Sequence, residues 1–391
     1  MSLATLLVAT LAAHASADTT LPSLQARIAA IAATVDGDVG AAALHLESGV
    51  GVATRGDDLF FLASVYKLPI AVALLRRADA GTVGLGDTVR LAPWDFRLGR
   101  ATLAPNAPGG GGAYTVAELL RAMIADSDNT AGDAILALAG GPSAVTDTLR
   151  ALGLGGIRID RSALATLLEF YGVGDLPLGS ELTPERVAAL VQASRAADRS
   201  AALDRFAREP WDSASALAVA ELLDRLWRGE LLSARSTALL LGHLEGGWIE
   251  TRLVAGVPPG TRVWHKTGSY AAAATHDAGI VELPDGTHLV VVVLVRQPRR
   301  DTEAAERAIA AITRAAWEFW AARPSNPRGG QPDAGEARPR SRATRPSSAR
   351  RCGTAAGWRG PHPATRAGSR PRPRPARRPR RGSTRTYRRT P

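Results

Sequence analysis

Lysine occurs at only two positions of this 391-residue chain, Lys67 and Lys266, whereas arginine occurs at 46. Arginine stays protonated in proteins, but a buried lysine can lose its proton and then act as a base. A lysine that is kept against this preference for arginine indicates a task that arginine cannot perform. Lys67 follows Ser64 by three residues, and Lys266 directly precedes Thr267. The sequence therefore predicts a site in which lysine amines act together with hydroxyl groups.

The first motif is Ser64-Val65-Tyr66-Lys67, at the predicted start of a helix that runs to about residue 78. Side chains at positions i and i+3 share a helix face, so the Ser64 hydroxyl and the Lys67 amine can meet. A serine hydroxyl becomes a good nucleophile when a base takes its proton, and a buried lysine with a lowered pKa can be that base. Taken alone, the motif also fits a helix-capping serine beside a solvated lysine.

The second motif is Ser127-Asp128-Asn129, in a predicted tight turn between helices at residues 116–125 and 130–138. The aspartate and the asparagine also fit a simple cap of the second helix. The motif therefore indicates chemistry only in combination with the others.

The third motif is Lys266-Thr267-Gly268-Ser269, at the end of a predicted strand. A lysine and a hydroxyl at the edge of a sheet can hold a substrate carboxylate. Gly268 would let the backbone of the substrate approach the strand closely. A plain surface charge is the alternative for Lys266.

Serine with lysine three residues later, Ser-Asp-Asn and Lys-Thr-Gly together form the signature of penicillin-recognising serine enzymes. The order of the motifs and their predicted helix, turn and strand contexts fit that signature. From about residue 20 to residue 322, the chain resembles class A β-lactamases and their serine-hydrolase relatives. Further matching segments lie at residues 115–120, 228–233, 252–260 and 276–281.

The resemblance implies three roles in bond making and breaking. Ser64 attacks the carbonyl carbon, and Lys67 acts as the base or as a proton relay. Ser127 passes a proton to the leaving nitrogen. Backbone N–H groups of Ser64 and Ser269 form the oxyanion hole, which stabilises the charge of the tetrahedral intermediate.

The resemblance also implies the substrate-binding residues. Asn129 holds the side-chain amide of the substrate and orients Lys67. Lys266 and Thr267 bind the substrate carboxylate, and Gly268 and Ser269 complete the binding edge of the strand.

One family residue is absent from its aligned position. Class A β-lactamases carry a glutamate on an Ω-shaped loop, where it activates the water that clears the acyl-enzyme. Alignment on Asp160 and Arg161 places Ala163 at the glutamate position, and Asp212 matches the closing aspartate of the loop. Residues 162–211 form a longer connection than the family's loop. Glu169 is the nearest substitute and is predicted as the catalytic base, with a solvated helix residue as the alternative.

Three functions follow from this pattern. The first is β-lactam hydrolysis with a displaced water-activating group, an activity of antibiotic resistance. The second is a related D,D-peptidase or esterase with slow or no β-lactam turnover, because acylation and deacylation are separate steps. The third is a non-catalytic penicillin-binding module, against which the three intact motifs argue.

The elements that must position these residues predict an α+β fold, an α/β/α sandwich. A helix at residues 21–33 and a strand pair at 39–46 and 51–55 come first, and three strands at 262–267, 277–283 and 287–295 with a helix at 303–320 come last. We expect an antiparallel sheet built from both chain ends, with an all-helical lobe inserted at about residues 70–245. An interface of this kind is a usual place for an active site. Further expected helices lie at 184–197, 214–227 and 233–244, and the glycine run at 109–112 is expected to be a loop.

The two chain ends differ in composition from the domain predicted at residues 18–322. Residues 2–17 fit a signal peptide, whose apolar run is too short to span a membrane, so a secreted or periplasmic protein is expected. Residues 323–391 contain 20 arginines and two acidic residues, a charge of +18, and the rest of the chain carries −7. This tail is predicted to be disordered. It has too few aromatic residues to indicate specific nucleic-acid binding, and a reading-frame artefact is the alternative.

Cysteine and histidine usage argues against a metal or a cofactor. The one cysteine, Cys352, lies in the tail, so no intrachain disulfide and no cysteine metal site can form. The seven histidines show no spacing typical of a ligand set. We expect a monomer that acts on a small molecule, either a β-lactam or a cell-wall peptide or ester, without a cofactor.

Overall fold

The computed structural model describes residues 20–173, 182–194, 196–206, 209–270, 273–296 and 301–323. Contacts divide the chain into two units, residues 1–355 and 356–391, and every described residue belongs to the first. The predicted signal peptide at residues 2–17 and the predicted tail beyond Arg323 lie outside the described residues. Among the helices that are described, none has the length and apolar character needed to cross a membrane.

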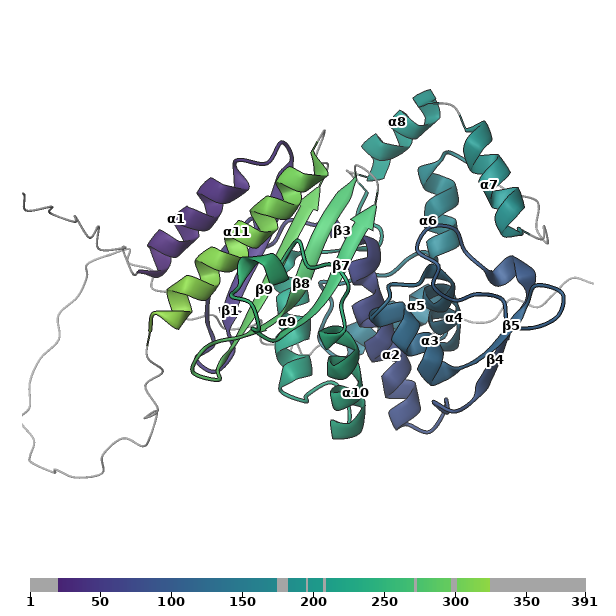
Figure 1. Cartoon of the computed structure of the whole chain (residues 1–391), viewed down its shortest axis with the longest axis horizontal. Coiled ribbons are helices and arrows are strands. Elements are labelled where there is room, and N and C mark those ends of the chain that lie inside the picture. The colour runs from purple at the N-terminus through teal and green to yellow at the C-terminus, as the bar shows by residue number, and fades with distance from the viewer. Residues whose placement is uncertain are drawn as a thin grey trace, which may run out of the picture. The chain divides into compact units, whose positions relative to one another are not determined.

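A five-stranded antiparallel sheet with the order β2-β1-β9-β8-β7 forms the centre of the first unit (Figure 1). Strand β1 pairs with β9 along its whole length, from Asp38 opposite Arg296 to His45 opposite Leu289. The sheet thus joins the two ends of the domain, which confirms the predicted antiparallel sheet built from both chain ends. Its strands are β1 (Asp38–His45), β2 (Val50–Thr54), β7 (Val263–Tyr270), β8 (Ala274–Glu282) and β9 (His288–Arg296).

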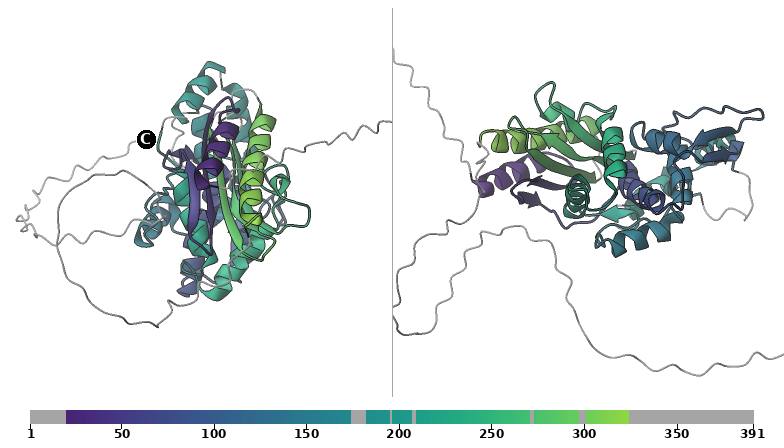
Figure 2. Two further views of the ribbon diagram at one scale, coloured as in Figure 1. Left: turned by 90° about the vertical axis from the view of Figure 1, so that its left-hand side faces the viewer. Right: turned by 90° about the horizontal axis from the view of Figure 1, so that it is seen from below.

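Helices cover both faces of the sheet (Figures 1 and 2). Helices α1 (Leu21–Ala32) and α11 (Thr302–Ala321) pack on one face, and α9 (Ala216–Trp227) and α10 (Ala234–Glu245) pack on the other. Strand β9 is therefore buried on both sides, which explains its unbroken run of Leu and Val from residue 289 to residue 295. The α+β fold class, with its α/β/α layers, is confirmed.

The inserted lobe is built around α2 (Lys67–Asp79). Residues 67–75 of this helix are all buried, because α3, α4 and α5 surround it within the lobe and α10 reaches it from the sheet. The other helices of the lobe are α3 (Val116–Ile124), α4 (Asn129–Leu138), α5 (Gly141–Ala151), α6 (Ala163–Phe170), α7 (Pro184–Ala193) and α8 (Ala196–Phe206). Elsewhere along the described chain, short 3-10 turns lie at η1 (Ala63–Tyr66), η2 (Pro93–Asp95) and η3 (Val254–Gly256).

Some local expectations need correction. The helix expected to begin at Ser64 begins instead as the 3-10 turn η1, and α2 starts at Lys67. Helices α5 and α8 were not expected, and a helix at α6 was considered only as the alternative for Glu169. The short pairs β3 (Phe60–Phe61) with β6 (Ser213–Ala214) and β4 (Thr88–Leu91) with β5 (Gly112–Thr115) were not expected either. Gly112 belongs to β5 rather than to the expected glycine loop. Strands of two to four residues show too few alternating positions for a sequence pattern to reveal them.

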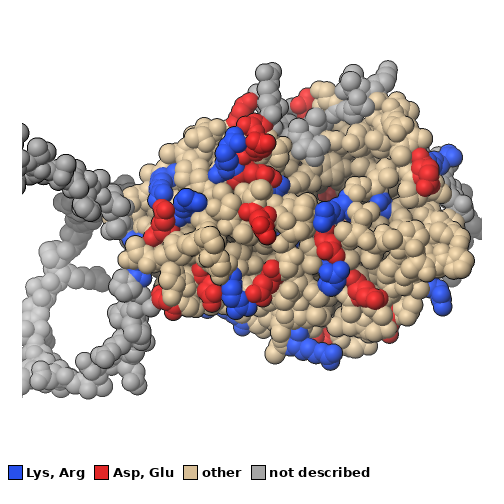
Figure 3. Space-filling view, viewed as in Figure 1, with Lys and Arg blue, Asp and Glu red and all other residues tan. Residues whose placement is uncertain are grey.

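Basic and acidic side chains are interspersed on the face of the molecule that Figure 3 shows. Exposed ion pairs among the described residues include Arg27 with Glu318 at 2.9 Å and Arg262 with Glu245 at 2.9 Å. The surface drawn there therefore presents no single-sign patch to a charged partner.

Candidate active site

Ser64 lies in the turn η1, between the short strand β3 and helix α2, and is half-buried. The residue before it, Ala63, has a φ of 44°, and two other residues near the site, Ser127 and Asp212, have φ values of 60° and 47°. Among the described residues only one further non-glycine residue, Arg55, has a positive φ. Strained backbone of this kind concentrates at functional sites, where the surrounding structure holds it in place.

Lys67 is fully buried at the start of α2, directly after the Ser64 turn. Its Nζ donates hydrogen bonds to the backbone oxygen of Ser127 at 2.6 Å and to Asn129 Oδ1 at 2.9 Å, and it lies 3.4 Å from Ser127 Oγ. Burial lowers the pKa of Lys67 to about 7, although the carboxylates of Asp128 and Asp133 act in the opposite direction. A large fraction of this amine is therefore neutral near pH 7 and can accept a proton.

The turn at residues 127–129 is held by Asp128. One oxygen of this carboxylate accepts from the backbone N–H of Ala131 at 2.8 Å, so Asp128 caps α4 as the sequence allowed. The other oxygen accepts from the backbone N–H groups of Thr102 at 2.5 Å and Leu103 at 3.0 Å. Asp128 therefore holds the turn in place, and the Ser127 side chain contacts both lysines.

The motif on β7 brings the second lysine to the same serine. Lys266 is buried, and its Nζ donates to Ser127 Oγ at 2.9 Å and to the backbone oxygen of Thr267 at 2.9 Å. Burial lowers the pKa of Lys266 well below its usual range, and the nearby Lys67 lowers it further. Ser127 thus lies between the two amines, at the point where the helical lobe meets the sheet.

Gly268 has a structural reason to be glycine. A Cβ atom at this position would lie 2.9 Å from the backbone oxygen of Leu62 and 3.1 Å from the backbone nitrogen of Val65. Strand β7 therefore packs directly against the turn that carries Ser64. The close approach that the sequence assigned to a substrate is, in the structure, an approach between two parts of the chain.

Arg252 supports the same strand, a contact that the sequence pattern did not reveal. Its guanidinium is buried and donates to Ser269 Oγ at 2.6 Å and to the backbone oxygen of Gly268 at 3.1 Å. It also pairs with Glu306 of α11 at 3.0 Å. The only sequence signal was the position of Arg252 at the start of a matching segment.

The aligned ends of the Ω-like segment meet in the structure. Arg161 Nε donates to Asp212 Oδ2 at 2.6 Å, and Asp212 Oδ1 accepts from the backbone N–H groups of Asp160 at 2.7 Å and Arg161 at 3.0 Å. Ala163 begins α6, and its backbone N–H donates to Asp133 at 2.6 Å. No carboxylate side chain is available at the aligned glutamate position, because alanine occupies it.

Glu169 lies on α6 and turns towards Arg161, with 2.5 Å between its carboxylate and the guanidinium. Arg161 also pairs with Glu209 at 2.7 Å, so three carboxylates share one buried cation. Glu169 is 43% exposed and is not among the residues that line the pocket beside Ser64. The structure thus brings the three motifs together but leaves Glu169 outside their cluster.

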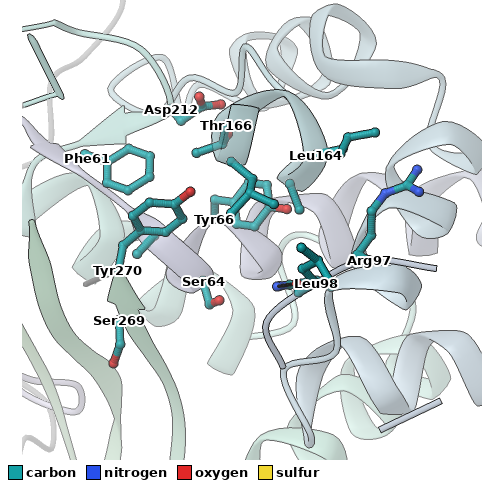
Figure 4. A pocket seen from close by; sticks show the side chains of 14 residues that line it. Phe61, Ser64, Tyr66, Arg97, Leu98, Leu164, Thr166, Asp212, Ser269 and Tyr270 are labelled. Atoms are coloured by element: carbon teal, nitrogen blue, oxygen red, sulfur yellow. Dashed lines mark hydrogen bonds between the residues drawn. The ribbon is translucent and has the colours of Figure 1, made fainter. Parts of the chain in front are cut away.

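A pocket opens beside Ser64, between the sheet and α6 (Figure 4). Its walls include Asn129 and Ser269 of the motifs, and the apolar side chains of Phe61, Ala163 and Leu167. In Figure 4, Asp212 lies on the opposite side of the pocket from Ser64, and Tyr66 and Tyr270 lie between them. The described residues contain no group of three or more histidine, cysteine, aspartate or glutamate side chains that could hold a metal ion.

Comparison with known proteins identifies the family of the chain. The model of the beta-lactamase enzyme family matches residues 23–320. The chain is 29% identical over 294 residues to the extended-spectrum beta-lactamase PER-1 of Pseudomonas aeruginosa, which covers 69% of this chain and 82% of that protein. It is 30% identical over 288 residues to the carbapenem-hydrolysing beta-lactamase KPC of Klebsiella oxytoca, which covers 72% and 84%. A solved beta-lactamase structure from Chitinophaga pinensis matches with a TM-score of 0.60 and 28% identity, over 75% of this chain and 98% of that chain.

Proposed function

This chain belongs to the beta-lactamase enzyme family, and from that membership we propose that it is a serine hydrolase that opens β-lactam rings through an acyl-enzyme at Ser64. The observation that carries the proposal is the environment of Lys67. A fully buried amine with a pKa of about 7 lies one helical turn from Ser64 and contacts Ser127, which also contacts Lys266.

The proposed acylation uses these groups in sequence. Ser64 Oγ attacks the β-lactam carbonyl carbon while its proton passes to the neutral amine of Lys67. The carbon–nitrogen bond then breaks, and the nitrogen takes a proton from Ser127, which Lys67 replaces. Lys266 and Thr267 bind the substrate carboxylate, an anion whose charge favours the protonated form of Lys266. Asn129 holds the side-chain amide of the substrate.

Mass spectrometry of the intact protein after mixing with benzylpenicillin tests the proposal. A mass increase equal to the antibiotic is expected in the wild type and is expected to be absent in Ser64→Ala. Lys67→Arg keeps the positive charge but removes the base, so we expect acylation to slow by about 100-fold or more. Arg77→Lys, an exposed exchange on the same helix, is the matched control. Absence of both an adduct and hydrolysis in the wild type would exclude β-lactamase activity.

A D,D-peptidase or esterase with slow β-lactam turnover is the second candidate. It is favoured by Ala163, which lines the pocket at the aligned glutamate position. Such an enzyme would form the Ser64 adduct, retain it for hours, and hydrolyse a peptide ending in D-alanyl-D-alanine or a simple ester. A non-catalytic binding module would retain the adduct and hydrolyse neither. Chromogenic cephalosporin turnover separates both from a β-lactamase.

Export is part of the same proposal. Residues 2–17 read as a signal peptide, with Ala15-Ser16-Ala17 as the cleavage site and Asp18 as the first mature residue. Expression of the full chain in a bacterium should yield an exported protein whose amino-terminal sequence begins at Asp18. A cytoplasmic product that retains residues 2–17 would contradict it.

A further inference from the structure

Tyr66 is a residue of the Ser64 turn whose hydroxyl the proposed acylation does not use. Its side chain is only 7% exposed. Its Oη is enclosed and has no hydrogen-bond partner among the described residues. Burying a hydroxyl without a partner costs folding free energy, so a phenylalanine would serve packing better. The hydroxyl therefore requires an explanation other than the stability of the fold.

The Tyr66 side chain lines the pocket beside Ser64, together with Ala163 at the aligned glutamate position (Figure 4). The carboxylate that lines this pocket, Asp212, is held by Arg161 and by two backbone N–H groups. Glu169 is bound by the same arginine. Neither Asp212 nor Glu169 therefore has a carboxylate that is free to activate the deacylating water beside Ser64.

Lys67 Nζ and the Tyr66 hydroxyl both lie near Gly132. A Cβ atom placed on Gly132 of α4 would lie 3.7 Å from Tyr66 Oη and 4.0 Å from Lys67 Nζ. A neutral lysine amine has two N–H donors and one lone pair. The backbone oxygen of Ser127 and Asn129 Oδ1 occupy the two donors, and Ser127 Oγ lies 3.4 Å from Nζ. The lone pair would then accept a proton from a water that enters between the Tyr66 and Lys67 side chains.

We propose that the Tyr66 hydroxyl holds the water that hydrolyses the Ser64 acyl-enzyme, and that Lys67 is the base for this step. The inference rests on the proposed function, because it requires an acyl group on Ser64. Burial raises the pKa of Tyr66 well above its usual value, so the hydroxyl keeps its proton and can both donate to and accept from water.

Hydrolysis of the acyl-enzyme consumes one water and returns both Ser64 and Lys67 to their starting forms. The water oxygen bonds to the ester carbonyl carbon while one water proton passes to the lone pair of Lys67. The tetrahedral intermediate collapses, the bond between the carbonyl carbon and Ser64 Oγ breaks, and Ser64 Oγ takes the proton back from Lys67. The open-ring acid leaves, and both Ser64 and Lys67 return to their starting forms. Tyr66 neither gains nor loses a proton overall.

A second tyrosine hydroxyl in the pocket, that of Tyr270, also has no partner among the described residues. Its ring packs edge-on against Phe61 and Phe170, at centroid distances of 5.6 Å and 4.7 Å, and stacks on Phe206. That aromatic cluster gives Tyr270 a packing role on the far wall. Tyr66 lines the pocket together with Ser64, and its Oη and Lys67 Nζ both lie near Gly132, so the geometry assigns the water to Tyr66.

The test separates the two chemical steps in the full-length protein. Wild type, Tyr66→Phe and Tyr270→Phe are mixed with benzylpenicillin, and intact mass spectrometry follows formation of the adduct and its loss after excess antibiotic is removed. Tyr171→Phe is the matched control, because Tyr171 lies next to the same aromatic cluster but does not line the pocket. For Tyr66→Phe we expect adduct formation within about twofold of wild type and adduct loss slowed about tenfold or more, the worth of one hydrogen bond.

Hydroxylamine supplies an independent readout, because this strong nucleophile cleaves an ester without a held water. It should release the adduct from wild type and Tyr66→Phe at similar rates. A rate of spontaneous loss that is unchanged in Tyr66→Phe overturns the inference, and so does equal slowing in Tyr270→Phe. A wild-type adduct that never hydrolyses overturns it as well but leaves acylation intact. Only the absence of any wild-type adduct would contradict the proposed function itself.

Discussion

The amine of Lys67 determines how the proposed chemistry depends on pH. Burial lowers its pKa to about 7, so the amine is mostly protonated below that pH and mostly neutral above it. Only the neutral form can take the proton of Ser64. We therefore expect kcat/KM for a chromogenic cephalosporin to be about tenfold lower at pH 6 than at pH 8. A profile that is flat from pH 6 to pH 8, in a protein whose folding is unchanged over that range, would contradict this assignment.

Glu169 is the residue for which sequence and structure lead to different expectations. If Glu169 were the catalytic base, the Glu169→Gln variant would be unable to clear the acyl-enzyme. Its ion pair with Arg161 leads us to expect that Glu169→Gln clears the adduct within about threefold of the wild-type rate. Because the carboxylate is 43% exposed, we expect the free energy of unfolding to fall by about 1 kcal/mol or less.

Glu230→Gln is the matched control, since the Glu230 side chain is similarly exposed, at 49%, and pairs with Arg225 at 3.2 Å. Urea unfolding and adduct loss would be measured for both variants. Loss of deacylation in Glu169→Gln alone would restore Glu169 to the role of base.

Among the elements, the contact of β7 with the Ser64 turn is the one on which the site depends most. Gly268→Ala would place a Cβ atom 2.9 Å from the Leu62 oxygen, and backbone on both sides must then separate. A displacement of about 1 Å at a catalytic group can cost about 100-fold in rate. We expect acylation to slow by that order and the melting temperature to fall.

Gly155→Ala is the control for this substitution, because a Cβ atom there would meet nothing within 4 Å. Acylation rates and thermal melts of the two variants would be compared. Wild-type acylation in Gly268→Ala would show that the strand and the turn are not tightly coupled.

The sequence was sufficient for the strands of the central sheet, for several of the helices and for the three motifs, but it did not reveal α5 and α8, which are 11 residues long. Helices such as α3 and strands such as β9 show many periodic positions, and the motif residues carry distinctive chemistry. The pair of short strands β3 and β6 could not be predicted, because two residues show no period and their partners are 152 residues apart at Phe61 and Ser213. Likewise, the bond from Arg252 to Ser269 depends on a fold-level approach that local pattern does not contain.

At the scale of the whole molecule, the predicted domain boundary makes a simple test possible. All three motifs, Ala163 and Asp212 lie before residue 270. A chain that ends at Arg323 should therefore keep the melting temperature and the acylation rate of the full chain, while its formal net charge changes from +11 to −6.

Ion-exchange binding and thermal melts of the shortened and full-length proteins check this expectation. Slower acylation or a lower melting temperature in the shortened protein would show that the Arg-rich segment contributes to the domain. Otherwise the basic segment contributes charge and nothing to catalysis.

The pairing of β1 with β9 has a consequence for the order in which the protein forms. Asp38 and Arg296 bond across 258 positions of the chain, so the central pair of strands cannot close until almost the entire domain has been synthesised. Closing so long a loop is slow, because its entropic cost precedes the contacts that repay it. The packing of strand β7 against the turn that carries Ser64 depends on the same late closure. We therefore expect a partly synthesised chain to lack the β1–β9 pair, and Ser64 to acquire its proposed activity only when β9 is in place.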